Sequence, residues 1–428
     1  MEKLALFGGT PTVKETPNHM FKWPIITKED EDAALEVIRG NKFSGVDITE
    51  KFCEEFAQWQ GVKYALAYTN GTMSLAAAMF AIGLQPGDEI ICTTKTYWAS
   101  IVPANTFGAK AVFCNVNEML SMDPADIEHR ITPKTKALMV VHYCAYPCDM
   151  DAIMAIAKKH NLIVIEDVSH AQGGMYKGKK LGSFGDIAAM SMMSGKTFAA
   201  GEMGMLVTDN RDYYVRALAY AHHERFHEGY IEQLGELQPF SRISLGAVKG
   251  RVNQLCAALG RVQLKYYDER CAEIRKAMNY FWDLLEGLPG IRPIRVDEST
   301  GSNMAGFYCS NGLYLSEELH GLSVNRFCEA VRAENGSWCD PGANACLHTH
   351  PFFYDFATTP SDKDDSLQRS VDIECFSVPN FKCFDKEWIE AYAAGYRKVI
   401  ENHEQLLAGD SHTKQETRWI GIGNKKQR

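Results

Sequence analysis

The chain has 428 residues, 46% of them hydrophobic and 23% charged, which is typical of a folded globular protein and excludes a disordered or collagen-like chain. The formal net charge is −9, from 45 Lys and Arg against 54 Asp and Glu, so nothing draws the chain generally toward nucleic acid or anionic lipid. No apolar run approaches the about 20 residues that span a bilayer. The start, MEKLALFGGTPTVKETPNH, has no signal-peptide core. We therefore expect a cytoplasmic protein that binds neither membranes nor nucleic acid.

The 13 cysteines form no CxxC pair and mostly lie in apolar runs such as IICTT. This distribution favours buried, reduced thiols over disulfides or a metal cluster.

Short apolar segments bounded by turn residues predict strands at 63–69, 88–94, 110–116, 136–142, 161–167 and 204–209. Longer apolar patterns between them predict helices over 74–84, 100–109 and 150–160. Strands that alternate with helices indicate a mostly parallel sheet with helices on its faces, so the predicted fold class is α/β.

A long helical pattern over 257–288 connects this region to a segment of mixed pattern. We predict a division of the chain into four parts: an N-terminal arm at 1–27, a large α/β domain at 28–265, a smaller C-terminal domain at 266–412 and a polar tail at 413–428.

The loops that follow parallel strands are where α/β enzymes place their chemistry. Asn70, Gly71 and Thr72 follow the first predicted strand and precede a helical run. Glycine lets the backbone approach a ligand closely, and the first amides of a helix favour an anion, so a phosphate suits this loop. The alternative is an ordinary Asn-Gly turn with a helix cap.

Two further loops carry ionisable side chains. Glu166 and Asp167 end the predicted strand 161–167, where a carboxylate can hold a cationic ring nitrogen. The alternative is that Asp167 caps the next turn. Lys196 lies between two apolar runs, where a solvated face is hard to place, and such a lysine can form a Schiff base. A solvated surface charge is the alternative.

The order and spacing of these loops resemble the DegT/DnrJ/EryC1/StrS family of pyridoxal-phosphate-dependent sugar and cyclitol aminotransferases. The resemblance runs from LALFGGTPTV through VHYCAYPCDMDAIMAIAKKHNLIVIEDVSHAQGGMYKGKKLGSFGDIAAMSM to LHTHPFFYDF and FSVPNF. The opening LALFGG is most similar to the branch that acts on inosose-type cyclitols.

The resemblance implies the type I fold of pyridoxal-phosphate enzymes, with a mostly parallel seven-stranded sheet between helices and a smaller C-terminal α+β domain. It implies transfer of an amino group from glutamate or glutamine to a keto group on a sugar, a sugar nucleotide or a cyclitol. A dehydratase, and a non-catalytic regulator that binds the cofactor or a nucleotide sugar, are the alternatives. Related dehydratases have histidine where this chain has Lys196, which argues against that reaction.

The family's active-site residues can be carried over where the motifs match. The resemblance implies that Lys196 forms the Schiff base with pyridoxal 5′-phosphate and moves the proton. It implies that Asp167 pairs with the ring nitrogen and that His170 lies against one face of the ring. Tyr97 matches the aromatic residue on the other face, although spacing alone does not decide between Tyr97 and Trp98.

The phosphate contacts implied by the resemblance are Gly71, Thr72 and Ser191. Family members also lend an Asn, two residues before an Arg, to the active site of the partner subunit. This chain has Lys249 and Arg251 there, so we predict a homodimer with shared active sites, in which Lys249 contacts the phosphate and Arg251 lies on the substrate side.

After the lysine, members commonly have Gly-Glu-Gly-Gly. This chain has Gly201, Glu202, Met203 and Gly204, which implies a loop with less conformational freedom.

Two patterns could indicate a metal. Residues 223–227 read HERFH and match the H-E-x-x-H zinc motif, which makes a zinc metalloprotease a remote alternative, but no downstream third ligand is evident. Cys346, His348 and His350 alternate in a segment for which we expect a packed strand. The resemblance places His348 in a loop on the substrate side. We predict no bound metal.

Overall fold

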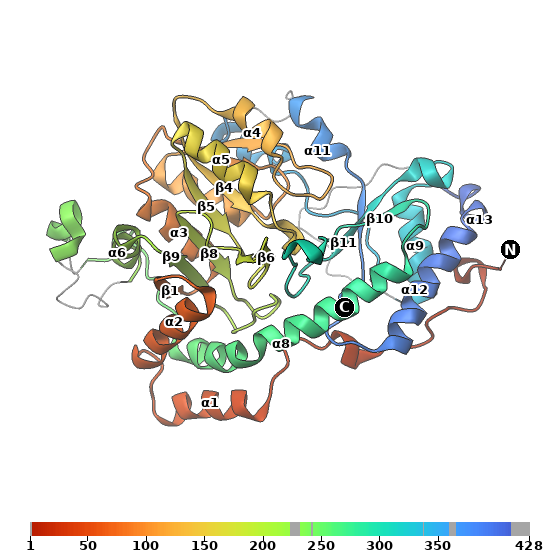
Figure 1. Cartoon of the computed structure of the whole chain (residues 1–428), viewed down its shortest axis with the longest axis horizontal. Helices are drawn as coiled ribbons and strands as arrows, with labels where there is room; N and C mark the ends of the chain where they lie inside the picture. The colour runs from red at the N-terminus through yellow and green to blue at the C-terminus, as the bar shows by residue number, and fades with distance from the viewer. Residues whose placement is uncertain (1, 223–231, 241–242, 337, 359–364, 412–428) are drawn as a thin grey trace.

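The computed structural model describes residues 2–222, 232–240, 243–336, 338–358 and 365–411. A sheet covered by helices and a smaller C-terminal region lie side by side, and the long helix α8 (Gln254–Leu284) runs along both of them (Figure 1).

The larger sheet has seven strands in the order β1-β9-β8-β5-β4-β2-β3. Its strands are β1 (Tyr64–Tyr68), β2 (Glu89–Thr93), β3 (Lys110–Cys114), β4 (Thr135–Val141), β5 (Ile163–Asp167), β8 (Ile187–Ser191) and β9 (Gly204–Thr208). Strand β9 pairs antiparallel with β1 and β8, and the other neighbouring strands of this sheet pair parallel. The structure confirms the predicted mostly parallel sheet and all six predicted strands, and it adds β8, which the sequence analysis missed.

The helices that accompany this sheet are α1 (Lys28–Arg39), α2 (Asp47–Gln60), α3 (Gly71–Ala81), α4 (Pro124–Arg130), α5 (Met150–His160) and α6 (Arg211–Ala219). The predicted helices at 74–84 and 150–160 correspond to α3 and α5. The expected helix at 100–109 instead consists of two short 3-10 helices, η3 (Trp98–Ser100) and η4 (Val102–Phe107). Pro103 lacks the N–H that an α-helix would use, which accounts for the difference.

Alternation along the strands sorts side chains to the two faces of the sheet. Leu138 and Val140 of β4 pack in a buried cluster with Ile153 of α5. Met139 of β4 instead belongs to the buried cluster that contains Leu75 of α3. Helices therefore cover both faces, as expected for a parallel sheet.

The C-terminal region is built on an antiparallel sheet of β10 (Ile291–Pro293), β11 (Asn311–Tyr314) and β12 (Cys375–Ser377). Its helices are α9 (Val324–Asn335), α10 (Phe352–Phe356), α11 (Gln368–Asp372), α12 (Lys386–Glu401) and α13 (Glu404–Leu407). A two-stranded ribbon of β6 (Met175–Tyr176) and β7 (Lys179–Lys180) lies in the larger region.

The remaining short elements are 3-10 helices: η1 (Ala5–Phe7), η2 (Asn18–Phe21), η5 (Tyr143–Ala145), η6 (Glu232–Phe240), η7 (Glu298–Thr300), η8 (Ser316–Leu319), η9 (Leu347–Thr349) and η11 (Asp365–Leu367).

The N-terminal segment runs along the C-terminal region before it reaches α1 (Figure 1). The buried carboxylate of Glu334 on α9 accepts hydrogen bonds from the backbone N–H groups of Ala5 and Thr12, at 2.7 and 3.1 Å, and from Lys398 Nζ at 3.1 Å. These contacts tie residues at the two ends of the chain together.

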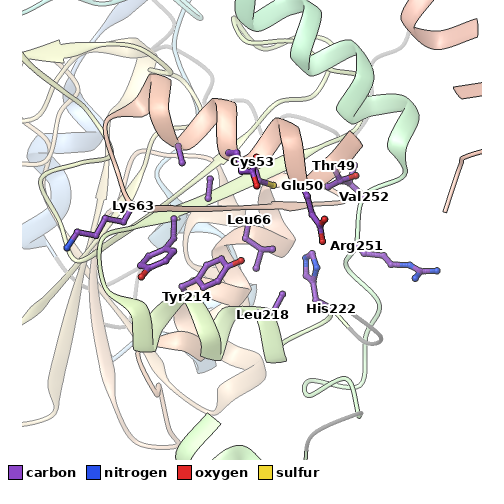
Figure 2. A pocket seen from close by; sticks show the side chains of 14 residues that line it. Thr49, Glu50, Cys53, Lys63, Leu66, Tyr214, Leu218, His222, Arg251 and Val252 are labelled. Atoms are coloured by element: carbon purple, nitrogen blue, oxygen red, sulfur yellow. The ribbon is translucent and has the colours of Figure 1, made fainter. Parts of the chain in front are cut away.

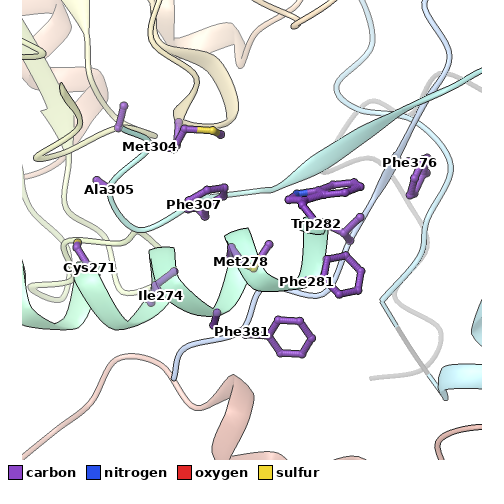
Figure 3. Close-up of a cluster of buried hydrophobic side chains, with 14 of the residues drawn as sticks. Cys271, Ile274, Met278, Phe281, Trp282, Met304, Ala305, Phe307, Phe376 and Phe381 are labelled. Carbon is purple, nitrogen blue, oxygen red and sulfur yellow. The ribbon is translucent and has the colours of Figure 1, made fainter. Parts of the chain in front are cut away.

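An aromatic cluster holds α8 against the C-terminal region. Phe281 and Trp282 of α8 are buried beside Phe307 and Phe381 (Figure 3). Residues 265 and 266 lie within α8, so the chain does not break where we divide it. The division at 1–27, 28–265, 266–412 and 413–428 stays a proposal. None of the helices in the described part of the chain is both long and apolar enough to cross a membrane.

Candidate active site

Lys196 lies in the loop after β8, at the interface with the C-terminal region. Its Nζ is 4.3 Å from the centre of the Tyr308 ring, and its carbonyl oxygen accepts a 2.8 Å hydrogen bond from Trp23 Nε1. Burial lowers the pKa of the Lys196 amine, against the opposing effects of Cys309 and Asp167. Lys196 is therefore a half-buried amine, not the solvated surface charge that was the alternative.

Asp167 ends β5 and is 4% exposed. Ser100 Oγ donates a 2.7 Å hydrogen bond to Asp167 Oδ2, and the Ser169 backbone N–H donates a 3.0 Å bond to Oδ1. The bond from Ser169 is the turn cap that the sequence offered as the alternative role for Asp167. The bond from Ser100 comes from a loop that is distant in the sequence. Hydrogen bonds to both oxygens fix the orientation of the carboxylate.

The neighbouring carboxylate, Glu166, faces away from this site. It is fully buried and accepts hydrogen bonds from the backbone N–H groups of Gly182, Phe184 and Gly185 at 2.6 to 2.8 Å, and it lies 3.1 Å from His142 Nε2. Adjacent residues on a strand point to opposite faces, so Glu166 supports the fold and Asp167 alone is presented to the site.

His170 lies at the turn after β5. Its Nδ1 accepts a 3.2 Å hydrogen bond from the Cys144 N–H, and its ring centre is 4.5 Å from that of Tyr308. Burial and the nearby Lys196 charge hold the pKa of His170 well below its ordinary value. The ring is therefore neutral near pH 7, and the proton is on Nε2 because Nδ1 accepts.

The loop at the start of α3 meets the end of β8. A Cβ on Gly71 would lie 2.6 Å from Ser191 Cβ, so only glycine permits this approach. Asn70 caps the helix by accepting a 2.9 Å bond from the Met73 N–H, while the amides at the first positions of a helix have no carbonyl partner within it. Gly71, Thr72 and Ser191 therefore surround a helix N-terminus that suits an anionic phosphate.

The Gly201–Gly204 loop accommodates Met203 at the position where family members commonly have glycine. Met203 is fully buried, and its carbonyl oxygen accepts a 2.7 Å hydrogen bond from the Met192 N–H. A Cβ on Gly204 would lie 2.3 Å from the Asn70 carbonyl oxygen. Close packing against Asn70 thus requires glycine at 204 and not at 203.

Tyr97 and Trp98 lie immediately before Ser100, so both flank the site of Asp167. Each is 40% exposed, and their ring centres are 4.9 Å apart. Two exposed rings at this place are available to cover a planar ligand, and the geometry of the chain does not choose between them.

Lys249 and Arg251 lie on the strand-like segment beside the end of β1. The Thr69 N–H donates a 2.7 Å hydrogen bond to the Gly250 carbonyl, and Arg251 forms a bridge with Tyr68. Lys249 is exposed. The segment therefore adjoins the loop 69–72 at the start of α3 but is not among the residues that surround Lys196.

A cavity of about 320 Å³ lies next to this segment, between α2, β1 and α6 (Figure 2). Glu50 and His222 lie close together at one end of it, and the Arg251 side chain points away (Figure 2). None of its lining residues belongs to the loops after β5 or β8, so we do not place the reaction there.

His348 is buried, and its Nδ1 lies 2.5 Å from the hydroxyl oxygen of Thr94, the residue after β2. The strand expected for Cys346–His350 is wrong: residues Leu347–Thr349 form the 3-10 helix η9. Thr349 bonds back to the Cys346 carbonyl through both its N–H and its hydroxyl, which closes a turn that alternation of residue types could not reveal.

The H-E-x-x-H sequence at His223–His227 lies outside the residues that the structure describes. Within the described ranges, no group of three His, Cys, Asp or Glu side chains is arranged to hold a metal.

Several side chains at this site carried no signal in the sequence analysis: Trp23, Ser100, Tyr308, Cys309 and Lys382. Trp23, Tyr308, Cys309 and Lys382 lie in irregular segments, and it is the tertiary fold that brings them to Lys196.

Several known proteins resemble this chain. Residues 24–383 match the DegT/DnrJ/EryC1/StrS aminotransferase family. GDP-perosamine synthase of Escherichia coli O157:H7 is 35% identical over 60% of this chain and 69% of its own length. L-glutamine:2-deoxy-scyllo-inosose aminotransferase of Streptoalloteichus tenebrarius is 27% identical over 95% of this chain and 99% of its own. A solved aminotransferase from Psychrobacter cryohalolentis, 28% identical, superposes with a TM-score of 0.78 over 89% of this chain and 98% of its own. The predicted resemblance is confirmed, and the chain belongs to the DegT/DnrJ/EryC1/StrS aminotransferase family.

Proposed function

We propose that this protein binds pyridoxal 5′-phosphate and transfers an amino group from glutamine or glutamate to a ketone carbon of a sugar or cyclitol ring. The observation that carries the proposal is the convergence of a half-buried amine, Lys196, with a fixed carboxylate, Asp167, at the ends of neighbouring strands β8 and β5.

The residues present fit this cofactor. Gly71, Thr72 and Ser191 suit its phosphate, because the missing Cβ of Gly71 lets the start of α3 pack against Ser191, and the first amides of a helix favour an anion. Asp167 suits its ring nitrogen, and the neutral ring of His170 suits one face of the pyridine. Tyr97 or Trp98 would cover the other face. When bound, the cofactor supplies an electron sink for a carbanion formed on the amino-bearing carbon.

The protein's own groups then have distinct tasks. Lys196 Nζ would hold the cofactor and afterwards carry a proton to and from the reacting carbon, a task helped by the lowered pKa of its amine. Asp167 would keep a proton on the ring nitrogen, with Ser100 holding the carboxylate in place. His170 remains neutral, so it adds no positive charge beside Lys196.

The names of relatives support the class of acceptor. One relative is named a GDP-perosamine synthase, and another, matched over nearly its whole length, an L-glutamine:2-deoxy-scyllo-inosose aminotransferase. We infer an acceptor with a ketone on a six-membered polyhydroxy ring, and glutamine or glutamate as donor. A dehydratase is the weaker candidate because Lys196 stands where related dehydratases have histidine.

We also propose a homodimer with shared active sites. The exposed Lys249 lies on the segment beside the phosphate loop, and nothing at the Lys196 site of its own chain requires it. Its charge would contact the phosphate bound by a second copy, and Arg251 would lie toward that copy's substrate.

The two half-reactions test the proposal separately. Glutamine or glutamate added alone to the purified holoprotein should remove the visible absorbance of the lysine-bound cofactor. A keto-cyclitol such as scyllo-inosose, or a nucleotide-linked keto sugar, should then restore it, as expected for ping-pong kinetics. A protein that holds the cofactor but never responds to either donor would instead be a binding protein or would catalyse another reaction.

A further inference from the structure

A second lysine, Lys382 of the C-terminal region, lies near Lys196. Cys309 precedes β11 and Lys382 follows β12, and the Cys309 thiol lies within electrostatic range of both Lys196 and Lys382. Tyr308, next to Cys309, lies against Lys196 Nζ. Two ammonium groups from different regions of the fold therefore flank one thiol.

The Trp23 indole links the two lysines: its Nε1 donates a 2.8 Å hydrogen bond to the Lys196 carbonyl oxygen, and its ring centre is 5.3 Å from Lys382 Nζ. The Cys309 side chain is exposed. Even so, burial among surrounding protein atoms raises the pKa of its thiol. A small molecule that reached Lys196 would thus also meet Cys309.

No carboxylate of the described ranges lies within ion-pair distance of Lys382. Its Nζ donates a 3.0 Å hydrogen bond to the neutral amide oxygen of Asn380 and lies 5.3 Å from the centre of the Trp23 ring. No ion pair to Lys382 occurs within the described ranges. Burial lowers the pKa of Lys382 to about 8. The amine is therefore mostly charged at neutral pH, and an anionic ligand would offset the cost of burying it.

The position of Lys382 is fixed by its neighbours. Phe307 and Phe381, which anchor the two segments, are buried in the aromatic cluster against α8 (Figure 3). Asn380 Nδ2 donates a 2.8 Å hydrogen bond to the Phe307 carbonyl, and the Lys382 N–H donates a 2.7 Å bond to the Met20 carbonyl. The ammonium group is thus held on a rigid support, as a binding group should be.

We propose that Lys382 binds the α-carboxylate of the amino donor. This inference rests on the proposed function. An α-amino acid carries its carboxylate on the same carbon as the reacting amine, so a cation beside Lys196 is where that carboxylate arrives. Glutamine carries only the α-carboxylate, so with glutamine as donor the group that meets Lys382 cannot be the side chain. A neutral sugar or cyclitol ketone brings no such group, so Lys382 distinguishes the donor from the acceptor.

The test uses the holoenzyme and 2-methylglutamine, a donor analogue whose only carboxylate is the α-carboxylate and which, without an α-hydrogen, binds but cannot react further. Its dissociation constant is read from the shift of the cofactor absorbance. Lys382→Gln should raise that constant about 10- to 100-fold, the range expected for a lost charge-assisted hydrogen bond. Lys382→Arg should stay within about threefold of the wild type, because it keeps the charge.

Two controls make the result specific. Lys276→Gln removes an exposed lysine that lies 4.1 Å from the Phe384 ring on the outside of α8, and it should leave donor binding unchanged. The rate at which the keto acceptor restores the cofactor absorbance should also be unchanged in Lys382→Gln. Wild-type enzyme should bind 4-aminobutanamide, which is glutamine without its α-carboxylate, as weakly as the variant binds 2-methylglutamine.

The outcomes separate this inference from the proposed function. If the wild type responds to glutamine but Lys382→Gln binds 2-methylglutamine as tightly as the wild type does, the inference is wrong and the aminotransferase function stands. A loss confined to the acceptor step would assign Lys382 to an anionic group of the acceptor and would also overturn it. If Lys382→Gln does not fold, tight wild-type binding of 4-aminobutanamide overturns it equally. If the wild type never responds to glutamine or glutamate, the proposed function itself fails.

Discussion

Ser100 and Asp167 are 67 residues apart in the sequence, yet Ser100 Oγ donates a 2.7 Å hydrogen bond to Asp167 Oδ2. The serine lies on the loop after β2 and the aspartate at the end of β5, with β4 between these strands in the sheet. The bond links the segment that bears Tyr97 and Trp98 to the carboxylate. It therefore fixes the position of these aromatic residues relative to Asp167, the proposed partner of the ring nitrogen.

This relationship predicts a graded pair of variants. Asp167→Asn should lower kcat about 100- to 1,000-fold, the range for losing a preorganised charge. Ser100→Ala should lower it about 10-fold, because the carboxylate keeps its charge but loses one of its hydrogen bonds. In the double variant, kcat should be close to that of Asp167→Asn alone, since the Ser100 hydroxyl acts through the Asp167 carboxylate. Steady-state kinetics at saturating cofactor measure these kcat values. Near-native turnover in Asp167→Asn would contradict the role proposed for Asp167 at the ring nitrogen.

Gly71→Ala should weaken cofactor binding at least about 10-fold. The new Cβ would overlap Ser191, and relieving such overpacking typically costs about 1–3 kcal/mol. Equilibrium dialysis of the cofactor and thermal unfolding measure the two effects. Thr72→Ser is the matched control, because it changes the adjacent residue but keeps the hydroxyl. Native affinity in Gly71→Ala would show that this loop does not form the phosphate site.

The large sheet was predictable because its strands are short apolar runs separated by turn residues. Strand β8 escaped notice because its sequence, Ile-Ala-Ala-Met-Ser, is rich in alanine, which has no strand preference. Its place is set by pairing with β5 and β9, a tertiary effect.

The site residues likewise fall into a group that the sequence could predict and a group that it could not. Lys196, Asp167 and Gly71 follow strands, so their approximate meeting place could be inferred from the sheet topology. Cys309 and Lys382 are in irregular segments more than 110 residues beyond Lys196, and only the packing of Phe307 and Phe381 on α8 brings them there. No local pattern records such contacts.

The buried His170 predicts a specific pH dependence of stability. Its folded-state pKa lies well below the ordinary value of about 6.5, so below that pH the unfolded chain binds a proton that the folded chain does not. His170 therefore lowers the stability of the protein as pH falls through about 6.5. Between about pH 7.5 and about pH 5.5, the urea midpoint of unfolding should fall more for the wild type than for His170→Gln. Glutamine keeps a hydrogen-bond acceptor at this position but does not titrate. Equal drops would mean that His170 is charged in the folded state.

Complementation between inactive chains tests the shared site. Lys196→Ala and Lys249→Ala chains, mixed and allowed to exchange, should form heterodimers in which one site has both native lysines. Random pairing predicts about a quarter of wild-type activity, since half the dimers are mixed and each has one native site. A mixture no more active than its parents would show that Lys249 serves its own chain or no active site at all.

The most direct test of the whole account is the identity of the lysine that holds the cofactor. Borohydride reduction of the yellow holoprotein, followed by proteolysis and mass spectrometry, fixes the cofactor to the amine that bears it. The account predicts a single modified peptide with the label on Lys196. Two other buried or partly buried lysines, Lys95 and Lys382, are the informative alternatives. A label on either of them, or no label in a protein that binds the cofactor, would contradict the proposed active site.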